Sequence, residues 1–217
     1  MTIVLYLFVI TAGYLIGAIP SGLIVGKLYR GVDVRQYGSQ RTGATNVLRT
    51  LGPGASAVVL LADALKGAVV VLIARLLLAH LQPFWVGPLG EVLAALAAMV
   101  GHNWPVYIGF RGGRGVAVSV GSMAVLVPLA SVVGVLVGVA VIALSRFVSL
   151  GSVVGTIIAA LFIIGWVALG LAPQSYVLFS VVAGSVIVLQ HRDNIGRLLA
   201  GTERKLGQPV PPTGTQG

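Results

Sequence analysis

Long apolar stretches constrain this chain more than any other feature. They cover residues 3–25, 54–78, 89–102, 116–128, 130–144, 150–171 and 176–190. A helix needs about 20 apolar residues to cross a bilayer, so the third, fourth and fifth stretches are short. Only 9% of the residues are charged, whereas a soluble domain carries about 25%. A polar surface cannot be built from so few charges, and the sequence predicts an all-α integral membrane protein.

Basic residues fall on alternate connections between these stretches. Twelve of the fourteen share this placement, namely Lys27, Arg30, Arg35, Arg41, Arg49, Arg111, Arg114, Arg146, Arg192, Arg197, Arg204 and Lys205. Cytoplasmic loops carry the excess of Lys and Arg. We therefore predict seven transmembrane helices, with the N-terminus outside and the C-terminus cytoplasmic. Residues 1–207 should form one membrane domain, and 208–217, rich in Pro, Gly and Thr, a disordered cytoplasmic tail.

The net charge of +9 is large for so apolar a chain. Such a charge is typical of proteins that bind nucleic acid, anionic lipid or anionic substrates. Nucleic acid is the weakest of these, because the sequence contains no soluble basic domain. The chain has no Cys, which excludes disulfides, thiolate catalysis and Cys-ligated metals. We expect no metal and no cofactor.

Two polar segments before the predicted fourth span have the composition of anion-binding loops. Residues 37–49 mix small residues, hydroxyls, an amide and two Arg, which suits contact between backbone N–H groups and an anion. Residues 101–115 interleave Gly112, Gly113 and Gly115 with two Arg before an apolar helix, whose N-terminus also favours anions. The P-loop spacing for nucleotides is absent. A solvated cytoplasmic loop and a Gly-rich hairpin are the alternative interpretations.

Two further polar groups lie at helical spacing. His191, Asn194 and Ile195 share one face if the last helix continues past residue 190. His191 can also be an ordinary interfacial residue. Asp63 and Lys66 lie three residues apart inside a predicted span. They can pair on one face, either as part of a site or as a strut between helices.

Taken in order, these segments resemble the bacterial acyl-phosphate:glycerol-3-phosphate acyltransferases. The family's Gly-Ser-x-Asn-x-Gly-Ala-Thr-Asn loop with a following Arg is matched at 38–49, and its Asp-x-x-Lys-Gly at 63–67. Its Gly-His-x-x-Pro-Val and Phe-Lys-Gly-Gly-Lys-Gly-Val-Ala segments are matched at 101–117, and its His-Arg-x-Asn-Ile-x-Arg-Leu at 191–198. Four matches in order make the resemblance specific.

The resemblance implies transfer of an acyl group from acyl phosphate to glycerol 3-phosphate. The products would be lysophosphatidic acid and phosphate, in the first step of bacterial phospholipid synthesis. The enzyme would lie in the bacterial inner membrane, among lipid, with its site on the cytoplasmic side. A monomer is the simplest assembly, although the sequence leaves the assembly open. The implied catalytic residues are Ser39, His191 and Asn194, and the implied substrate-binding residues are Arg49, Arg114, Asn46, Thr45, Gly112, Gly113 and Gly115.

The chain departs from the family pattern at two places. Gln40-Arg41-Thr42 replaces a small residue, Asn, and a small residue or Pro, and Arg111 and Arg114 replace two Lys. Charge is kept, but the planar Arg fork changes the phosphate geometry. His191 is left with two possible roles, general base or positioning group, since a substrate phosphate oxygen can also take the proton.

Other function classes fit the sequence less well. The His-x4-Asp pair of thioester-using acyltransferases is missing, which disfavours acyl-CoA and acyl-carrier-protein donors. A small organic-anion transporter is the main alternative. Transporters usually place polar residues at the midplane of internal repeats, whereas here they lie towards one face and no repeat is evident. A non-catalytic lipid-binding scaffold is the third option.

Overall fold

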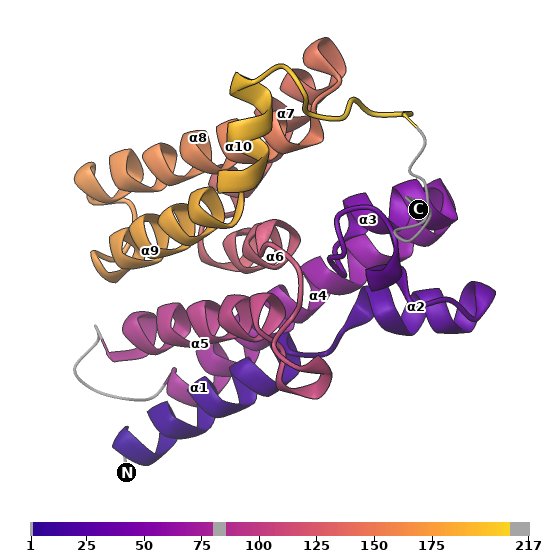
Figure 1. Cartoon of the computed structure of the whole chain (residues 1–217). Helices are drawn as coiled ribbons and strands as arrows, with labels where there is room; N and C mark the ends of the chain where they lie inside the picture. The colour runs from indigo at the N-terminus through magenta and orange to yellow at the C-terminus, as the bar shows by residue number, and fades with distance from the viewer. Residues whose placement is uncertain (1, 80–85, 209–217) are drawn as a thin grey trace.

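The computed structural model describes residues 2–79 and 86–208, and its regular elements there are helices (Figure 1). In chain order they are α1 (Thr2–Gly17), α2 (Ser21–Arg30), the short 3-10 helix η1 (Val34–Gln36), α3 (Ala44–Leu51), α4 (Pro53–Leu78), α5 (Val86–Asn103), η2 (Val106–Ile108), α6 (Val116–Leu126), α7 (Pro128–Ser145), α8 (Val148–Ala168), α9 (Ser175–Gln190) and α10 (Arg192–Leu199). The all-helical prediction is confirmed. Of the predicted tail, residues 209–217 lie outside the described residues.

All seven predicted apolar stretches hold helices, but they differ in length. Within the described residues, four candidates are long and apolar enough to cross a bilayer, namely α1 with α2, α4, α7 and α8. A fifth is added if α9 and α10 form one bent span. Helix α6 has only 11 residues. Four or five spans therefore meet the length criterion, and seven spans stay a prediction.

The helical path is broken at two places, within the first predicted stretch and directly after the last one. The first stretch is not one continuous helix, because α1 ends at Gly17 and α2 begins at Ser21 after Pro20. The last predicted helix is confirmed as α9, but it does not continue past residue 190 as a shared face for His191 and Asn194 would require, since the axes of α9 and α10 differ by 57°. The backbone N–H of His191 donates to the carbonyls of both Ile187 and Val188. Such shared bonds tighten the last turn of a helix and end its regular course.

Close helix packing in the interior depends on small residues. A Cβ added to Gly67 of α4 would overlap the carbonyl of Val118 on α6, and one added to Gly121 of α6 would overlap the carbonyl of Ala64 on α4. Small residues let backbones approach in this way inside a bilayer. The reciprocal contact holds α6 tightly against α4, and so fixes where the segment preceding α6 lies.

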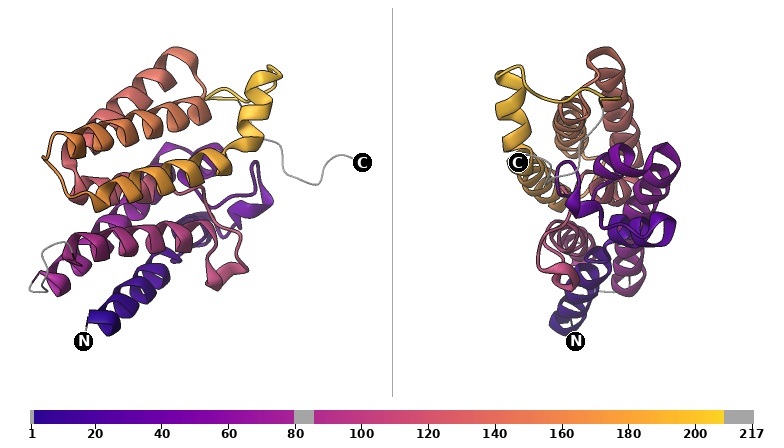
Figure 2. Two further views of the ribbon diagram at one scale, coloured as in Figure 1. Left: turned by 90° about the vertical axis from the view of Figure 1, so that its left-hand side faces the viewer. Right: turned by 45° about the vertical axis from the view of Figure 1, so that its right-hand side comes forward.

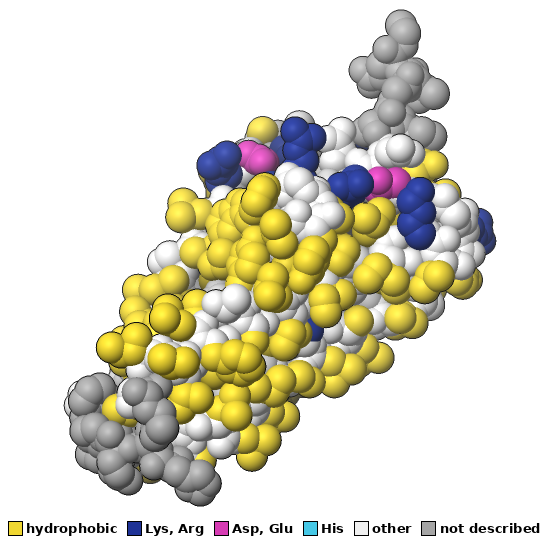
Figure 3. All heavy atoms as spheres, turned by 90° about the horizontal axis from the view of Figure 1, so that it is seen from below, with side chains coloured by type: hydrophobic (Ala, Val, Ile, Leu, Met, Phe, Trp, Pro, Cys, Tyr) yellow, Lys and Arg dark blue, Asp and Glu magenta, His cyan; other side chains and the backbone are white. Residues whose placement is uncertain are grey.

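The polar side chains gather at one end of the molecule. Helices α2, α3 and α10 and the segment between α5 and α6 lie at that end, while α1 begins at the opposite end (Figure 2). On the face shown in Figure 3, charged side chains lie mainly along this end, and hydrophobic side chains cover most of the rest. Leu61, Leu76 and Leu136 are 62%, 73% and 64% exposed. Such a surface suits contact with lipid tails.

A partly buried polar cluster joins α4, α5, α6 and α9 at the end of the molecule away from these charged side chains. Arg75 of α4 donates from Nε and Nη2 to the two carboxylate oxygens of Glu91 on α5, at 3.1 and 2.9 Å. Its Nη2 also donates to the carbonyl of Val125 at the end of α6. The hydroxyl of Tyr176 on α9 donates to Glu91 at 2.8 Å. We call Arg75, Glu91 and Tyr176 the distal cluster.

Candidate active site

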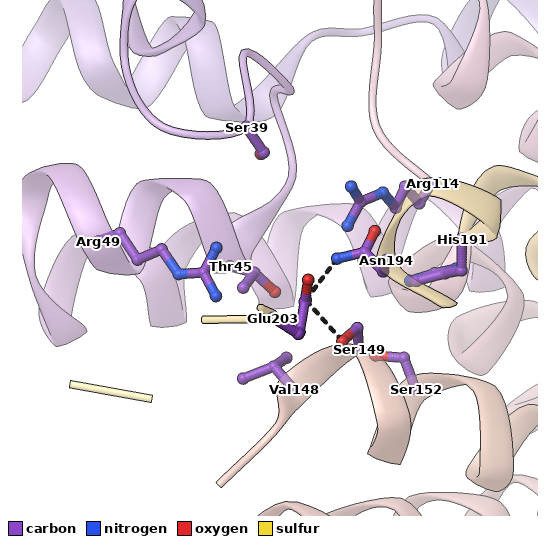
Figure 4. A pocket seen from close by; sticks show the side chains of 10 residues that line it. All are labelled: Ser39, Thr45, Arg49, Arg114, Val148, Ser149, Ser152, His191, Asn194 and Glu203. Carbon is purple, nitrogen blue, oxygen red and sulfur yellow. Dashed lines mark hydrogen bonds between the residues drawn. The ribbon is translucent and has the colours of Figure 1, made fainter. Parts of the chain in front are cut away.

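A small polar pocket lies at the charged end of the helices. Its volume is about 30 Å³, and its walls come from α3, α8, α10 and the segments beside them. The lining residues are Ser39, Thr45, Arg49, Arg114, Val148, Ser149, Ser152, His191, Asn194 and Glu203 (Figure 4). Six of the ten predicted site residues are among them. The fold therefore brings together side chains that are more than 150 residues apart in the chain.

Ser39 lies in the loop that precedes α3, and Asn46 of α3 holds it in place. The side chain of Asn46 accepts a hydrogen bond from the Ser39 backbone N–H at 3.0 Å. Its Nδ2 donates to the carbonyls of Val34, at 2.7 Å, and Arg41, at 2.9 Å. Asn46 is 2% exposed. This geometry favours a role in shaping the loop over the direct substrate contact that the family resemblance implies for Asn46.

Arg49 and Arg114 approach the pocket from opposite sides (Figure 4). Burial, together with the positive charges of Arg41 and Arg197, lowers the pKa of the Arg114 guanidinium to about 10. Burial also lowers the pKa of Arg49. Both groups stay protonated at neutral pH. The Nε of Arg114 is buried and finds no hydrogen-bond partner within residues 2–79 and 86–208, which leaves a donor for a ligand.

The sequence did not predict four pocket residues, Val148, Ser149, Ser152 and Glu203, and Glu203 is the charged one among them. Its carboxylate accepts hydrogen bonds from Ser149 Oγ at 2.7 Å, Asn194 Nδ2 at 2.6 Å and Arg197 Nε at 2.7 Å. Burial alone would raise the pKa of Glu203, but these three donors together lower it. One sequence signal could have identified Glu203. It lies in a polar segment, and the chain has only five acidic residues.

His191 occupies the break between α9 and α10. Its Nδ1 lies 2.8 Å from the carbonyl of Ile187. A carbonyl can only accept, so Nδ1 carries the proton and Nε2 is left as an acceptor. Burial lowers the pKa of His191 to about 4, and the charge of Arg114 adds to that shift. The imidazole is therefore neutral at physiological pH. Despite the 57° bend, His191 and Asn194 line one pocket.

None of the three predicted site glycines lines the polar pocket, although Gly113 and Gly115 line the apolar groove that opens from it. Gly112 donates its N–H to the carbonyl of Asn103, and Gly113 donates to the carbonyl of His102. These two amides are therefore not directed at a ligand, contrary to the expected donor-rich turn. Gly115 has a φ of +85° and caps α6. The segment that connects α5 to α6 instead positions the side chain of Arg114.

A larger apolar groove opens from the polar pocket. Its volume is about 480 Å³, and it is bordered by α3, α4, α6, α7 and α8. The residues shared with the polar pocket are Ser39, Thr45, Arg114, Val148, Ser152 and His191. Leu61 and Val139 line the groove and are 62% and 57% exposed. One site thus joins cationic, hydrogen-bonding groups to an apolar channel that borders the lipid-facing surface.

The chemistry available here is anion binding beside an acyl-sized channel. No cluster of three or more His, Cys, Asp or Glu able to hold a metal occurs in the described part of the chain. Two guanidinium groups suit phosphate, which they bind through charge-assisted hydrogen bonds.

Comparison with known proteins agrees with this arrangement. The family model for glycerol-3-phosphate acyltransferase matches residues 7–201. The glycerol-3-phosphate acyltransferase of Thermoanaerobacter sp. (strain X514) is 44% identical over 196 residues, which cover 90% of this chain and 92% of that protein. Glycerol-3-phosphate acyltransferase 2 of Moorella thermoacetica is 44% identical over 204 residues, covering 94% and 99%.

Two solved structures share the fold. Both are crystal structures of PlsY, an integral membrane glycerol 3-phosphate acyltransferase, one in a glycerol 3-phosphate form and one in a lysophosphatidic acid form. The first superposes with a TM-score of 0.82 at 37% identity, over 93% of this chain and 96% of that one. The second has a TM-score of 0.81 at the same identity. The chain belongs to the glycerol-3-phosphate acyltransferase family of integral membrane enzymes.

Proposed function

We propose that this acyltransferase moves an acyl group from acyl phosphate to glycerol 3-phosphate, giving lysophosphatidic acid and phosphate. The observation that carries the proposal is the junction of a small pocket holding Arg49 and Arg114 with an apolar groove of about 480 Å³. The pocket suits a phosphorylated, water-soluble acceptor, and the groove suits an acyl chain. The lysophosphatidic acid form of the PlsY structure supports the product.

In the proposed step, a glycerol hydroxyl oxygen attacks the acyl carbonyl carbon. A new carbon–oxygen ester bond forms, and the bond from the carbonyl carbon to the phosphate oxygen breaks. The hydroxyl proton passes to an oxygen of the departing phosphate or to His191. Since phosphate is already a good leaving group, the protein mainly positions two phosphates and offsets their charge.

We assign roles by position in the pocket. Arg49 and Arg114 bind phosphate, because each is cationic and both reach the same pocket. Ser39, His191 and Asn194 orient the glycerol phosphate and its attacking hydroxyl. The neutral imidazole presents Nε2 as an acceptor, which fits a hydrogen bond from that hydroxyl.

The membrane arrangement is part of the proposal. Seven crossings would place the N-terminus outside, the C-terminus inside and the pocket on the cytoplasmic side of a bacterial inner membrane. The gathering of basic residues on alternate connections supports this orientation. Reporter tags at the two termini test it, and finding both ends on the same side would overturn it.

Purified protein with acyl phosphate and glycerol 3-phosphate is the direct test of the reaction. We expect lysophosphatidic acid and inorganic phosphate to appear in equal amounts. Acyl-CoA serves as the matched donor control and should give little product. Efficient transfer from acyl-CoA with none from acyl phosphate would contradict the proposed donor while leaving the acyltransferase assignment intact.

A further inference from the structure

A second buried cluster borders the apolar groove of the candidate active site and has no role in the proposed reaction step. Asp63 and Lys66 of α4 form an ion pair, with 2.8 Å between Oδ1 and Nζ. The Nδ1 of His102, near the end of α5, lies 3.5 Å from the same carboxylate oxygen. These residues are only 2%, 7% and 6% exposed. Ionisable groups are costly inside a membrane protein and usually serve a function there.

His102 touches the segment that carries Arg114. Its carbonyl accepts the N–H of Gly113 at 3.0 Å, and the carbonyl of Asn103 accepts the N–H of Gly112 at 3.2 Å. A Cβ added to Gly113 would overlap the His102 imidazole. The ring therefore lies directly against the backbone of Gly113. Because Arg114 is the next residue, the orientation of the ring constrains the start of the Arg114 side chain.

Asp63 and Lys66 give that ring a fixed support. The Nζ of Lys66 donates to the carbonyl of Ile19, at the break between α1 and α2, at 2.9 Å. The Asp63 carboxylate is thereby held between a fixed ammonium group and His102. The cluster connects α4 to the α1–α2 break on one side and to the Arg114 segment on the other.

We propose that Asp63 and His102 form a positioning pair that holds Gly113, and through it aims the guanidinium of Arg114 at the substrate phosphate. The inference rests on the proposed phosphate-binding role of Arg114. Both residues act through Arg114 rather than on the reacting atoms. A misplacement of about 1 Å in a binding group can cost on the order of a hundredfold in rate, so a pair remote from the chemistry can matter.

Two substitutions test the pair in the full-length protein. His102→Phe keeps a ring against Gly113 but removes Nδ1, and Asp63→Asn removes the carboxylate charge. We expect either change to raise the KM for the substrate that Arg114 binds on the order of tenfold. If Asp63→Asn does not fold, His102→Phe still gives the test. A wild-type KM in folded His102→Phe overturns the proposal.

Glu91→Gln is the matched control. It removes a buried carboxylate charge from the distal cluster, where Glu91 is paired with the partly exposed Arg75. We expect it to lower Tm while leaving KM unchanged. An equal rise in KM for Glu91→Gln and Asp63→Asn would show that KM responds to any loss of a buried charge, and would overturn the positioning role.

The decisive readout is coupling to Arg114. In an Arg114→Gln background, His102→Phe and Asp63→Asn should change KM less than twofold, because residues that act through one group are not additive. Additive effects overturn the positioning pair while Arg114 keeps its role. If Arg114→Gln alone leaves the KM of both substrates unchanged, the proposed phosphate contact fails, and the positioning inference fails with it.

Discussion

Two clusters of charged side chains lie at opposite ends of the molecule and differ in their charge balance. In the distal cluster, the charge of Arg75 is matched by Glu91, whose carboxylate also accepts from Tyr176. In the candidate active site, Glu203 is the carboxylate among the guanidinium groups of Arg41, Arg49, Arg114 and Arg197. The charges of the distal cluster therefore balance each other, whereas the candidate active site has surplus positive charge.

Hydrogen bonding shows the same contrast. In the distal cluster, Arg75, Glu91 and Tyr176 are bonded to one another and to the carbonyl of Val125. In the candidate active site, Arg114 Nε and Asn194 Oδ1 are buried and lack partners among the described residues. A cluster whose charges balance joins helices, while surplus positive charge and the spare donor of Arg114 indicate a place for an anionic ligand.

The largest expected effect is a loss of catalytic efficiency when an Arg of the candidate active site is replaced. Replacing the Arg of the distal cluster should not cause this loss. Arg49→Ala and Arg114→Ala each remove a charge-assisted contact worth about 1.5–3 kcal/mol. Each should lower kcat/KM on the order of tenfold to a hundredfold, at about 1.4 kcal/mol per decade. Arg75→Ala should lower Tm and leave KM unchanged. Activity within twofold of wild type in folded Arg49→Ala and Arg114→Ala would remove both from the site.

A substitution that narrows the apolar groove should lower kcat/KM by a similar or smaller factor. Thr156 of α8 lines it, and Thr156→Phe should narrow the channel. Overpacking costs about 1–3 kcal/mol, so kcat/KM for long-chain acyl phosphates should fall about tenfold, with short chains less affected. Thr156→Ala is the control. Equal loss for short and long chains would place the acyl chain elsewhere.

His191 offers a smaller effect that distinguishes positioning from base catalysis. We expect His191→Asn to keep measurable turnover, and His191→Ala mainly to raise the KM for glycerol 3-phosphate. Since the pKa of His191 is lowered to about 4, the imidazole stays neutral between pH 5 and 8. The pH-rate profile should then lack a limb that disappears in His191→Asn. Loss of all turnover in His191→Asn, with folding and binding intact, would favour a general base instead.

The smallest effect is on acid stability and concerns Glu203. Its pKa in the folded protein is lowered relative to an unfolded value of about 4.3. The carboxylate therefore stabilises the fold at neutral pH, and this contribution is lost as the pH falls below about 4 and through the folded pKa.

Thermal unfolding from pH 7 to pH 3 measures that contribution. Wild type should lose more Tm on acidification than Glu203→Gln does. The matched control is Asp193→Asn, since the Asp193 side chain is 66% exposed and its ion pair is long at 3.7 Å. Identical acid profiles for wild type and Glu203→Gln would show that the three donors to Glu203 contribute little stability.

The sequence predicted the helical class and most of the pocket because both depend on composition and order along the chain. Apolar runs located the helices, and the polar segments near residues 39, 49, 114 and 191 supplied the pocket side chains. The break at His191 was not predictable from spacing, because it depends on how the N–H of His191 is shared between two carbonyls.

Two roles could only be assigned in three dimensions. Glu203 lies beyond the last motif, and its importance follows from three donors, one on α8 and two on α10, that converge on it. Gly112 and Gly113 have the composition of an anion cradle, yet their amides bond to the last carbonyls of α5. Composition alone cannot distinguish a donor that faces a ligand from one that ends a helix.

The groove beside Arg114 is bordered by lipid-facing side chains such as Leu61 and Val139. An acyl substrate in the membrane can then meet the pocket sideways, without crossing the aqueous phase. Its effective concentration is a mole fraction in the bilayer rather than a molarity in buffer. Diluting that substrate with inert lipid should therefore slow the reaction, while diluting the whole membrane suspension in buffer should not alter the turnover of each enzyme molecule at fixed glycerol 3-phosphate.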